Sequence, residues 1–102
     1  MKPVVIQSEA KSELAEGMAW YESRSPGVGL RLQAEVELAI ARLQRRPDWS
    51  MPYKRTGFRK QTVNHFPYCV FFMELPDCLW VAAIANMNRR PDYWRDRKRG
   101  SE

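Results

Sequence analysis

The chain has 102 residues, enough for one domain with its own hydrophobic core, and 44% of them are apolar. No apolar run approaches the roughly 18 residues of a membrane-spanning helix, and the run at residues 4–6 is too short for a signal peptide, so we expect a cytoplasmic protein with no membrane partner. The net charge is +5, and residues 89–99 supply most of it, which favours an acidic protein or nucleic acid as partner.

The N-terminal part predicts a strand followed by a helix. Residues 3–7 form a short run rich in β-branched side chains, which favours a strand. Ser8 is a typical helix N-cap. An apolar face at helical spacing follows, formed by Ala10, Leu14, Met18 and Tyr21. We interpret Glu13 and Glu16 on this helix as surface charges.

A second helix is predicted after a break at residues 23–27. Ser25 suits the N-cap and Pro26 the first helical position, and Pro47 ends the helix near Arg46. Its apolar face consists of Leu32, Val36, Ala39, Ile40 and Leu43. Two helices joined by a short loop are expected to form an antiparallel hairpin.

The second half of the chain predicts a loop and then strands. Residues 48–57 are expected to form a loop from which Trp49, Met51 and Tyr53 fold back onto the core. Three strands follow, over residues 58–63, 68–75 and 79–87. The last two are almost wholly apolar, which indicates burial on both faces of a sheet.

This order of elements predicts one α+β domain over residues 1–102. It consists of an N-terminal strand, an α-helical hairpin and then a three-stranded antiparallel sheet, in the order β-α-α-β-β-β, with the hairpin on one face of the sheet. Cys69 and Cys78 are expected to be reduced core residues. No cofactor or metal is expected, because His65 is the only histidine and lacks further ligands.

Five segments, in a fixed order along the chain, carry a family resemblance. Residues 8–14 and 20–22 are similar to the start and the aromatic end of that family's first helix, and residues 26–35 to its second helix. Residues 65–72 (His-Phe-Pro-Tyr-Cys-Val-Phe-Phe) resemble its Phe-Pro-Tyr strand pair, and residues 89–97 (Arg-Arg-Pro-Asp-Tyr-Trp-Arg-Asp-Arg) are the closest match. Together they resemble the RelE/ParE superfamily of toxins, and its ParE branch in particular.

The resemblance implies the toxin of a type II toxin–antitoxin module, also known as a plasmid stabilisation system. It implies a hetero-oligomer with a cognate antitoxin protein, and ParE-like members are associated with inhibition of DNA gyrase by binding. RelE-like members instead cut mRNA on the ribosome, and a non-toxic remnant that only binds an antitoxin is a third alternative. Asn86 stands where family members often carry a histidine, so the target is left open.

The basic, aromatic tail at residues 89–102 is expected to bind the antitoxin or the target. Its candidate contact residues are Arg89, Arg90, Tyr93, Trp94, Arg95 and Arg97. Arginines form bidentate pairs with carboxylates. Trp94 is expected either to anchor an interface or to dock on the helical hairpin and hold the tail.

An endoribonuclease would need cations around the scissile phosphate and groups that transfer protons. The candidates for these catalytic roles are Arg59, Lys60 and His65, with Arg89 as a further cation. Arginine is a poor general base because its pKa exceeds about 12. The sequence therefore favours a binding toxin over an enzyme.

Overall fold

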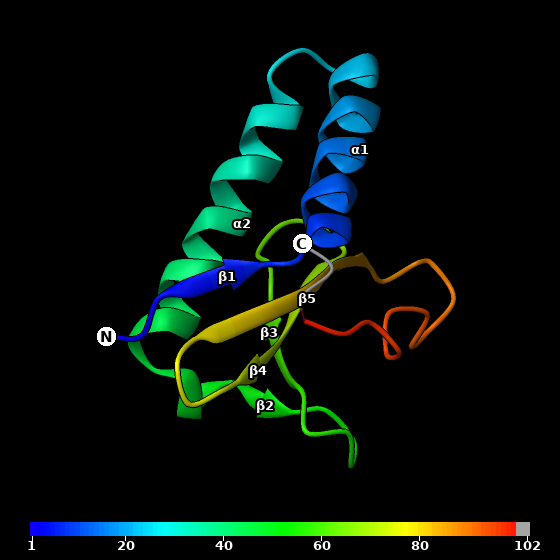
Figure 1. Ribbon diagram of the computed structural model, residues 1–102. Helices are drawn as coiled ribbons and strands as arrows, with labels where there is room; N and C mark the ends of the chain where they lie inside the picture. The colour runs from blue at the N-terminus through cyan, green and yellow to red at the C-terminus, as the bar shows by residue number, and fades with distance from the viewer. Residues whose placement is uncertain (100–102) are drawn as a thin grey trace.

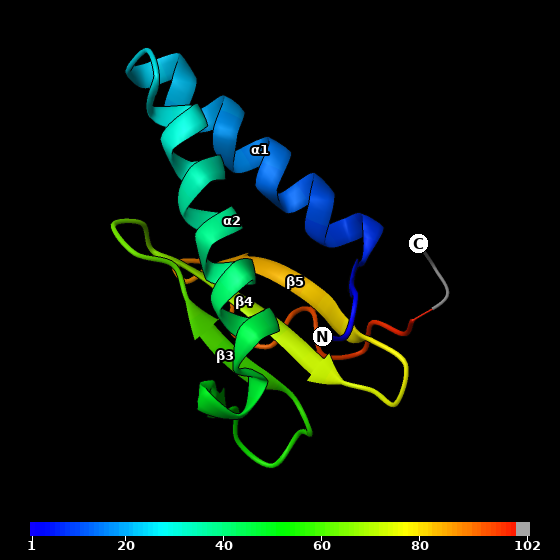
Figure 2. The same ribbon diagram turned by 90° about the vertical axis from the view of Figure 1, so that its left-hand side faces the viewer.

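An α-helical hairpin stands on one face of a five-stranded sheet in the computed structural model, which describes residues 1–99 (Figures 1 and 2). The strand order is β1-β5-β4-β3-β2, with β1 parallel to β5 and all other neighbours antiparallel. The strands are Val4–Ile6 (β1), Met51–Pro52 (β2), Arg59–Thr62 (β3), Tyr68–Glu74 (β4) and Leu79–Asn86 (β5). The sheet is larger than the predicted three strands, because β1 joins it beside β5 and β2 extends its other edge.

The central strands β4 and β5 are buried on both faces, as their apolar sequences predicted. Phe72 and Val81 belong to the core beneath the hairpin, and Phe71 belongs to a second core on the opposite face. Between the two strands the register shifts: Phe71 pairs with Ala83, and Phe72 pairs with Val81. Ala82 is thereby left out of the pairing, as in a β-bulge.

The predicted helical hairpin is formed by α1 (Ser8–Arg24) and α2 (Val28–Arg45). Ser8 is the first residue of α1 and not its cap. The buried line of α1 runs through Ala10, Glu13 and Gly17, whereas the rest of the predicted apolar face is only half-buried. Within residues 1–99, neither helix combines the length and apolarity that a bilayer span requires.

The start of α2 differs from the prediction that Ser25 would cap it. Its N-cap is Gly27, in the left-handed region at φ 90°, where glycine carries no steric penalty. The Glu22 carboxylate, near the end of α1, accepts the N–H groups of Gly27 (2.8 Å) and Gly29 (3.0 Å). A side chain of the preceding helix therefore satisfies donors that are otherwise left unpaired at a helix start.

The segment predicted as a loop, residues 48–57, departs furthest from expectation. It contains the end of a short 3-10 turn, Pro47–Trp49, followed by β2. Trp49 and Met51 do not fold onto the core: they are 72% and 68% exposed. Only Tyr53 packs as expected, edge-on to Phe71 with ring centroids 4.9 Å apart.

Gly17 allows the Tyr68 side chain to approach the backbone of α1. A Cβ at this position would overlap the Tyr68 hydroxyl and lie 3.0 Å from Leu32 Cδ2. Both neighbours are buried, so neither can move without disturbing the core.

Gly17→Ala should lower the free energy of unfolding by about 1 kcal/mol, because overpacking costs ~1–3 kcal/mol and the gain in helix propensity returns only ~1 kcal/mol. Urea denaturation measures this difference. Adding Tyr68→Phe removes the overlapping hydroxyl and should recover part of the loss. An alanine variant more stable than the wild type would contradict the close approach.

Candidate binding surface of the C-terminal segment

After β5 the chain turns back and packs on the sheet face that the hairpin leaves free (Figure 1, orange to red). The turn is fixed by hydrogen bonds from the Met87 N–H to the Pro67 carbonyl (2.7 Å) and from the Arg89 N–H to the Asn86 carbonyl (3.1 Å). We call residues 87–99 the C-terminal segment. The last three residues of the predicted tail, 100–102, lie outside the described residues.

Trp94 anchors the C-terminal segment to the sheet. Its side chain is 1% exposed and stacks on Phe71, with ring centroids 4.2 Å apart and an interplanar angle of 23°. Phe58 meets it edge-on at 4.9 Å, a favoured arrangement for aromatic rings. Trp94 therefore does not dock on the helical hairpin as proposed from the sequence, since it lies on the opposite sheet face. Its ring is part of a core and is not exposed as an interface anchor would be.

Glu13 of α1 is the buried acceptor that joins the C-terminal segment to the helical layer. Its side chain is 8% exposed, and its carboxylate accepts hydrogen bonds from the Tyr93 hydroxyl and from Arg97 Nη1 (3.0 Å) and Nη2 (3.1 Å). Its Oε1 also accepts the Ile84 N–H at 3.0 Å. Burial is the main cause, and the bond to Glu13 the next, of a pKa of Tyr93 far above its ordinary value, so the phenol keeps its proton at neutral pH and donates a hydrogen bond to Glu13.

Arg97 donates a hydrogen bond to the edge of β5 beyond the point where β1 ends. The last residue of β1, Ile6, pairs with Val81. One residue further along, the Ala82 carbonyl accepts a hydrogen bond from Arg97 Nη1 at 2.9 Å. The Arg97 side chain is 14% exposed. It therefore holds the segment in place, in contrast to the partner-facing position predicted for it.

The prediction that Glu13 is a surface charge is wrong. The available signal in the sequence was the line Ala10–Glu13–Gly17, in which two small residues flank the glutamate at helical spacing. Small residues on one helix face allow another backbone to approach, which places the carboxylate between them next to β5. The apolar periodicity of α1 gave no indication of this, because Glu13 is not apolar.

Asp92 fixes the turn in the middle of the C-terminal segment. Its backbone has φ 63°, and its carboxylate accepts hydrogen bonds from the Tyr53 hydroxyl and from Lys54 Nζ (2.8 Å). Arg95 Nη1 lies 3.5 Å from the same carboxylate. The Lys54 bond and then the Tyr53 bond hold the pKa of Asp92 below its usual range. Arg95, one of the predicted contact residues, remains partly exposed beside this cluster.

A notch of about 260 Å³ lies between α1 and the start of the C-terminal segment. It is lined from four elements, and its principal side chains are Glu16, Trp20, Tyr68, Asn86, Arg89 and Tyr93. The Arg89 guanidinium lies over the Tyr93 ring, with Cζ 4.4 Å from the ring centroid. Aromatic faces, amides and a guanidinium, together with the Glu13 and Glu16 carboxylates, suit the binding of a polar side chain of another macromolecule.

The structure divides the six predicted contact residues into two groups. Arg89 and Tyr93 meet at the notch, and Arg90 and Arg95 are exposed elsewhere on the segment. Trp94 and Arg97 point inward and fix the backbone that carries the others. The exposed members can contact a partner directly, while the buried members can act only by positioning them.

The three candidate catalytic residues do not converge. Arg59 and Lys60 are successive residues of β3, so their side chains leave opposite faces of the sheet. Arg59 Nη1 donates to the Ser50 carbonyl at 2.9 Å. His65 lies in the turn between β3 and β4 at φ 71°, with Nε2 3.6 Å from Glu35 Oε2. None of the three lines the notch.

Metal ligands and reactive thiols offer no alternative site in the part of the chain that the structure describes. Within residues 1–99, no three His, Cys, Asp or Glu side chains are grouped so that they could hold a metal ion. Cys69 and Cys78 are buried thiols, and burial raises the pKa of Cys69. A raised pKa keeps a thiol protonated and makes it a poor nucleophile.

The comparisons with known proteins agree with the fold expected from the resemblance. No family model and no curated protein matches the sequence. The structure is similar to a solved chain described as "Chromosomal ParDE TA system from P. aeruginosa", with a TM-score of 0.76 and 17% sequence identity. The match covers 84% of this chain and 96% of that chain. This chain therefore shares its fold with a chain of a ParDE toxin–antitoxin system.

Glu13→Gln should lower the free energy of unfolding by about 3 kcal/mol, because it removes the carboxylate that binds both Arg97 Nη atoms and leaves only the more distant, half-exposed Glu9 carboxylate at 3.9 Å. Glu16→Gln, one turn further along α1 and exposed, is the matched control and should change stability by less than ~0.5 kcal/mol. Urea denaturation of both variants gives the comparison. Equal effects of the two substitutions would contradict the anchoring role of Glu13.

Proposed function

We propose that this protein is a ParE-like toxin of a type II toxin–antitoxin pair, acts in the cytoplasm on DNA gyrase by binding it, and is neutralised by a cognate antitoxin in a hetero-complex. The observation that carries the proposal is the likeness in fold to a chain of a ParDE system over most of both chains. The sequence resemblance at residues 65–72 and 89–97 supports the same branch of the superfamily independently.

The build of the C-terminal segment supports a function in binding. Trp94 and the Glu13–Arg97 pair fix its backbone from two sides, and the exposed guanidinium group of Arg89 lies over the Tyr93 ring, which holds it in a defined position. A rigid surface loses little conformational entropy when a partner binds. Arginines presented beside an aromatic ring are common at the centres of protein interfaces.

The nuclease alternative has less support from the arrangement of side chains. An RNA-cleaving site needs cations and proton-transferring groups around one phosphate. Arg59 and Lys60 diverge from β3, and Arg59 is engaged with the Ser50 carbonyl. We therefore propose contact with the target through the exposed arginines, without chemistry at Arg59, Lys60 or His65.

Expression of the chain in bacteria without a partner, followed by pulse labelling, tests the proposal. DNA synthesis should stop first while translation continues. The double variant Arg89→Glu/Arg90→Glu should lose this effect, because it reverses the charge of exposed side chains and keeps Trp94 and the Glu13–Arg97 pair in place. Arg31→Glu, an exposed site on α2, is the matched control and should remain toxic.

Three outcomes would overturn the proposal. Early arrest of translation, abolished by Arg59→Ala or His65→Ala, would establish the ribonuclease alternative. Full toxicity of the double variant would remove the C-terminal segment from target binding. Uninterrupted growth at a verified level of folded protein would indicate a non-toxic remnant that only binds a partner.

A further inference from the structure

The outer face of α2 carries an apolar stripe that the fold does not cover. Leu30 and Leu38 are 64% and 54% exposed, and Ala34 and Ala41 are exposed between and beyond them. Spacings of four, four and three residues place these four side chains along one side of the helix. The core-facing side of α2 is a separate line that includes Leu32 and Val36. The helix therefore has a second apolar line that is not packed, bordered by the exposed carboxylate of Glu37 between Ala34 and Ala41.

The stripe leads to a basic corner at the end of α2. We define this corner by Arg42, Arg45, Arg46 and Trp49, which with Gln61 line a hollow of about 530 Å³. Trp49 is the most exposed aromatic side chain that the structure describes, and the Arg46 Cζ lies 4.1 Å from its ring centroid. Asp48 is the acidic side chain next to it, and Arg46 pairs with it at 3.3 Å.

The charge of the corner has a local explanation, but its tryptophan does not. Basic residues at a helix C-terminus interact favourably with the helix dipole, which accounts for Arg42 and Arg45. An exposed indole has no such benefit, because it leaves a large apolar surface in water. Exposed tryptophans beside arginines are typical of residues that dominate protein–protein binding.

We propose that the apolar stripe and the basic corner together bind an amphipathic, acidic segment of a partner protein. Apolar side chains of that segment would lie on Leu30 and Leu38, and its carboxylates would pair with Arg45 and Arg46. The inference deepens the proposed function and rests on it in one respect: the partner that carries this segment is taken to be the antitoxin.

A peptide fits this surface better than a nucleic acid does. The stripe offers leucine and alanine side chains, which have nothing to contribute to a phosphate backbone. One face of the Trp49 ring is already occupied by Arg46, which leaves less ring surface for a base to stack on. The charge complementarity is with carboxylates, which arginine binds in bidentate pairs.

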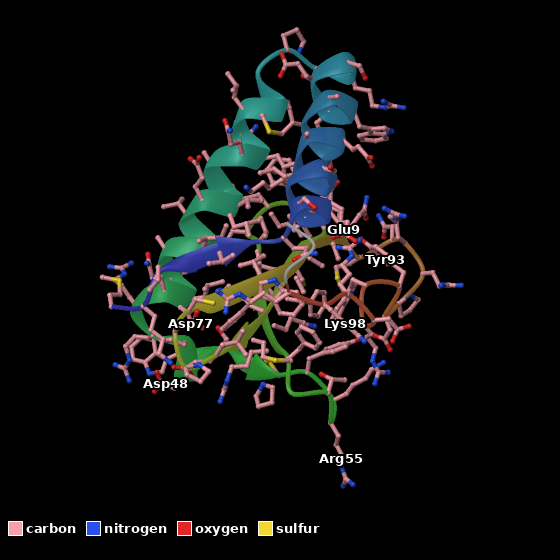
Figure 3. The ribbon with its side chains drawn as sticks, viewed as in Figure 1. Glu9, Asp48, Arg55, Asp77, Tyr93 and Lys98 are labelled. Atoms are coloured by element: carbon pink, nitrogen blue, oxygen red, sulfur yellow. The ribbon has the colours of Figure 1, made fainter. Side chains whose placement is uncertain are left out.

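This surface is separate from the notch. Figure 3 shows Asp48, beside the basic corner, at the opposite side of the molecule from Tyr93 and Lys98 of the C-terminal segment. In Figure 2 the base of α2 faces the viewer, whereas the C-terminal segment passes behind the sheet. Partner binding and target binding can therefore be separated by substitution.

NMR titration of the full chain with synthetic peptides tests the proposal. One peptide places leucines on one helical face and glutamates on the others, and a second replaces every glutamate by lysine. The first should shift the Trp49 indole and the Leu30 and Leu38 methyl signals, and raised salt should weaken its binding. The lysine peptide should leave these signals in place.

Substitutions test whether the peptide binds at the apolar stripe and the basic corner. Trp49→Ala and Leu38→Glu should each weaken binding of the acidic peptide by about tenfold or more. Lys11→Ala is the control, because Lys11 is exposed on α1 and lines neither the notch nor the basic corner. It should leave the affinity unchanged.

Four results would overturn the inference. The first is a shift of the Trp49 signal by a single-stranded oligonucleotide but not by the acidic peptide, and the second is a set of peptide-induced shifts confined to Trp20. The third is no peptide binding at all. The fourth is a concentration-dependent shift of the Leu30 and Leu38 signals without peptide, which would indicate that a second copy of this chain binds there. Absence of toxicity together with peptide binding at Trp49 would instead refute the proposed function alone and support the binding surface.

Discussion

The carboxylate of Glu13 is the interaction on which the arrangement of this protein depends. It is a buried charge, and such a group is stable only when it is paired and fully hydrogen-bonded. Two parts of the chain supply its partners: β5 contributes the Ile84 N–H, and the C-terminal segment contributes the Tyr93 hydroxyl and the Arg97 guanidinium. One side chain of α1 therefore fixes the helical layer, the irregular end of the sheet and the C-terminal segment relative to one another. The notch exists because these three parts meet there.

The sheet separates two cores of different construction. Beneath the hairpin, aliphatic side chains such as Leu32, Val36 and Ile84 fill the space between helices and strands. On the other face, the C-terminal segment covers the sheet through aromatic rings, chiefly Trp94 on Phe71. A segment without helix or strand can cover a sheet in this way because a few large rings bury much area, while Glu13 and Asp92 satisfy its polar groups.

The separation of surfaces bears on how a protein of this size could serve two partners. The notch and its exposed arginines lie beside the end of β5, whereas the stripe and the basic corner lie along α2 and toward β2. Both surfaces place a guanidinium over an aromatic ring, at Arg89 on Tyr93 and at Arg46 on Trp49. In each case the stacking restricts a flexible cation before a partner arrives, which reduces the entropy lost on binding.

The sequence by itself determined the helices, the three C-terminal strands and the burial of β4 and β5, because these follow from local periodicity and composition. It also identified the basic, aromatic tail as the distinctive region, but it assigned Trp94 and Arg97 to the same contact surface as Arg89 and Tyr93, whereas the side chains of Trp94 and Arg97 face inward. Tertiary structure alone decided that Trp94 faces inward, that Trp49 faces outward and that β1 and β2 extend the sheet. The same holds for Glu13, whose burial depends on Arg97, 84 residues away in the sequence. No local pattern encodes a pairing between two charges that meet only after the layers have assembled.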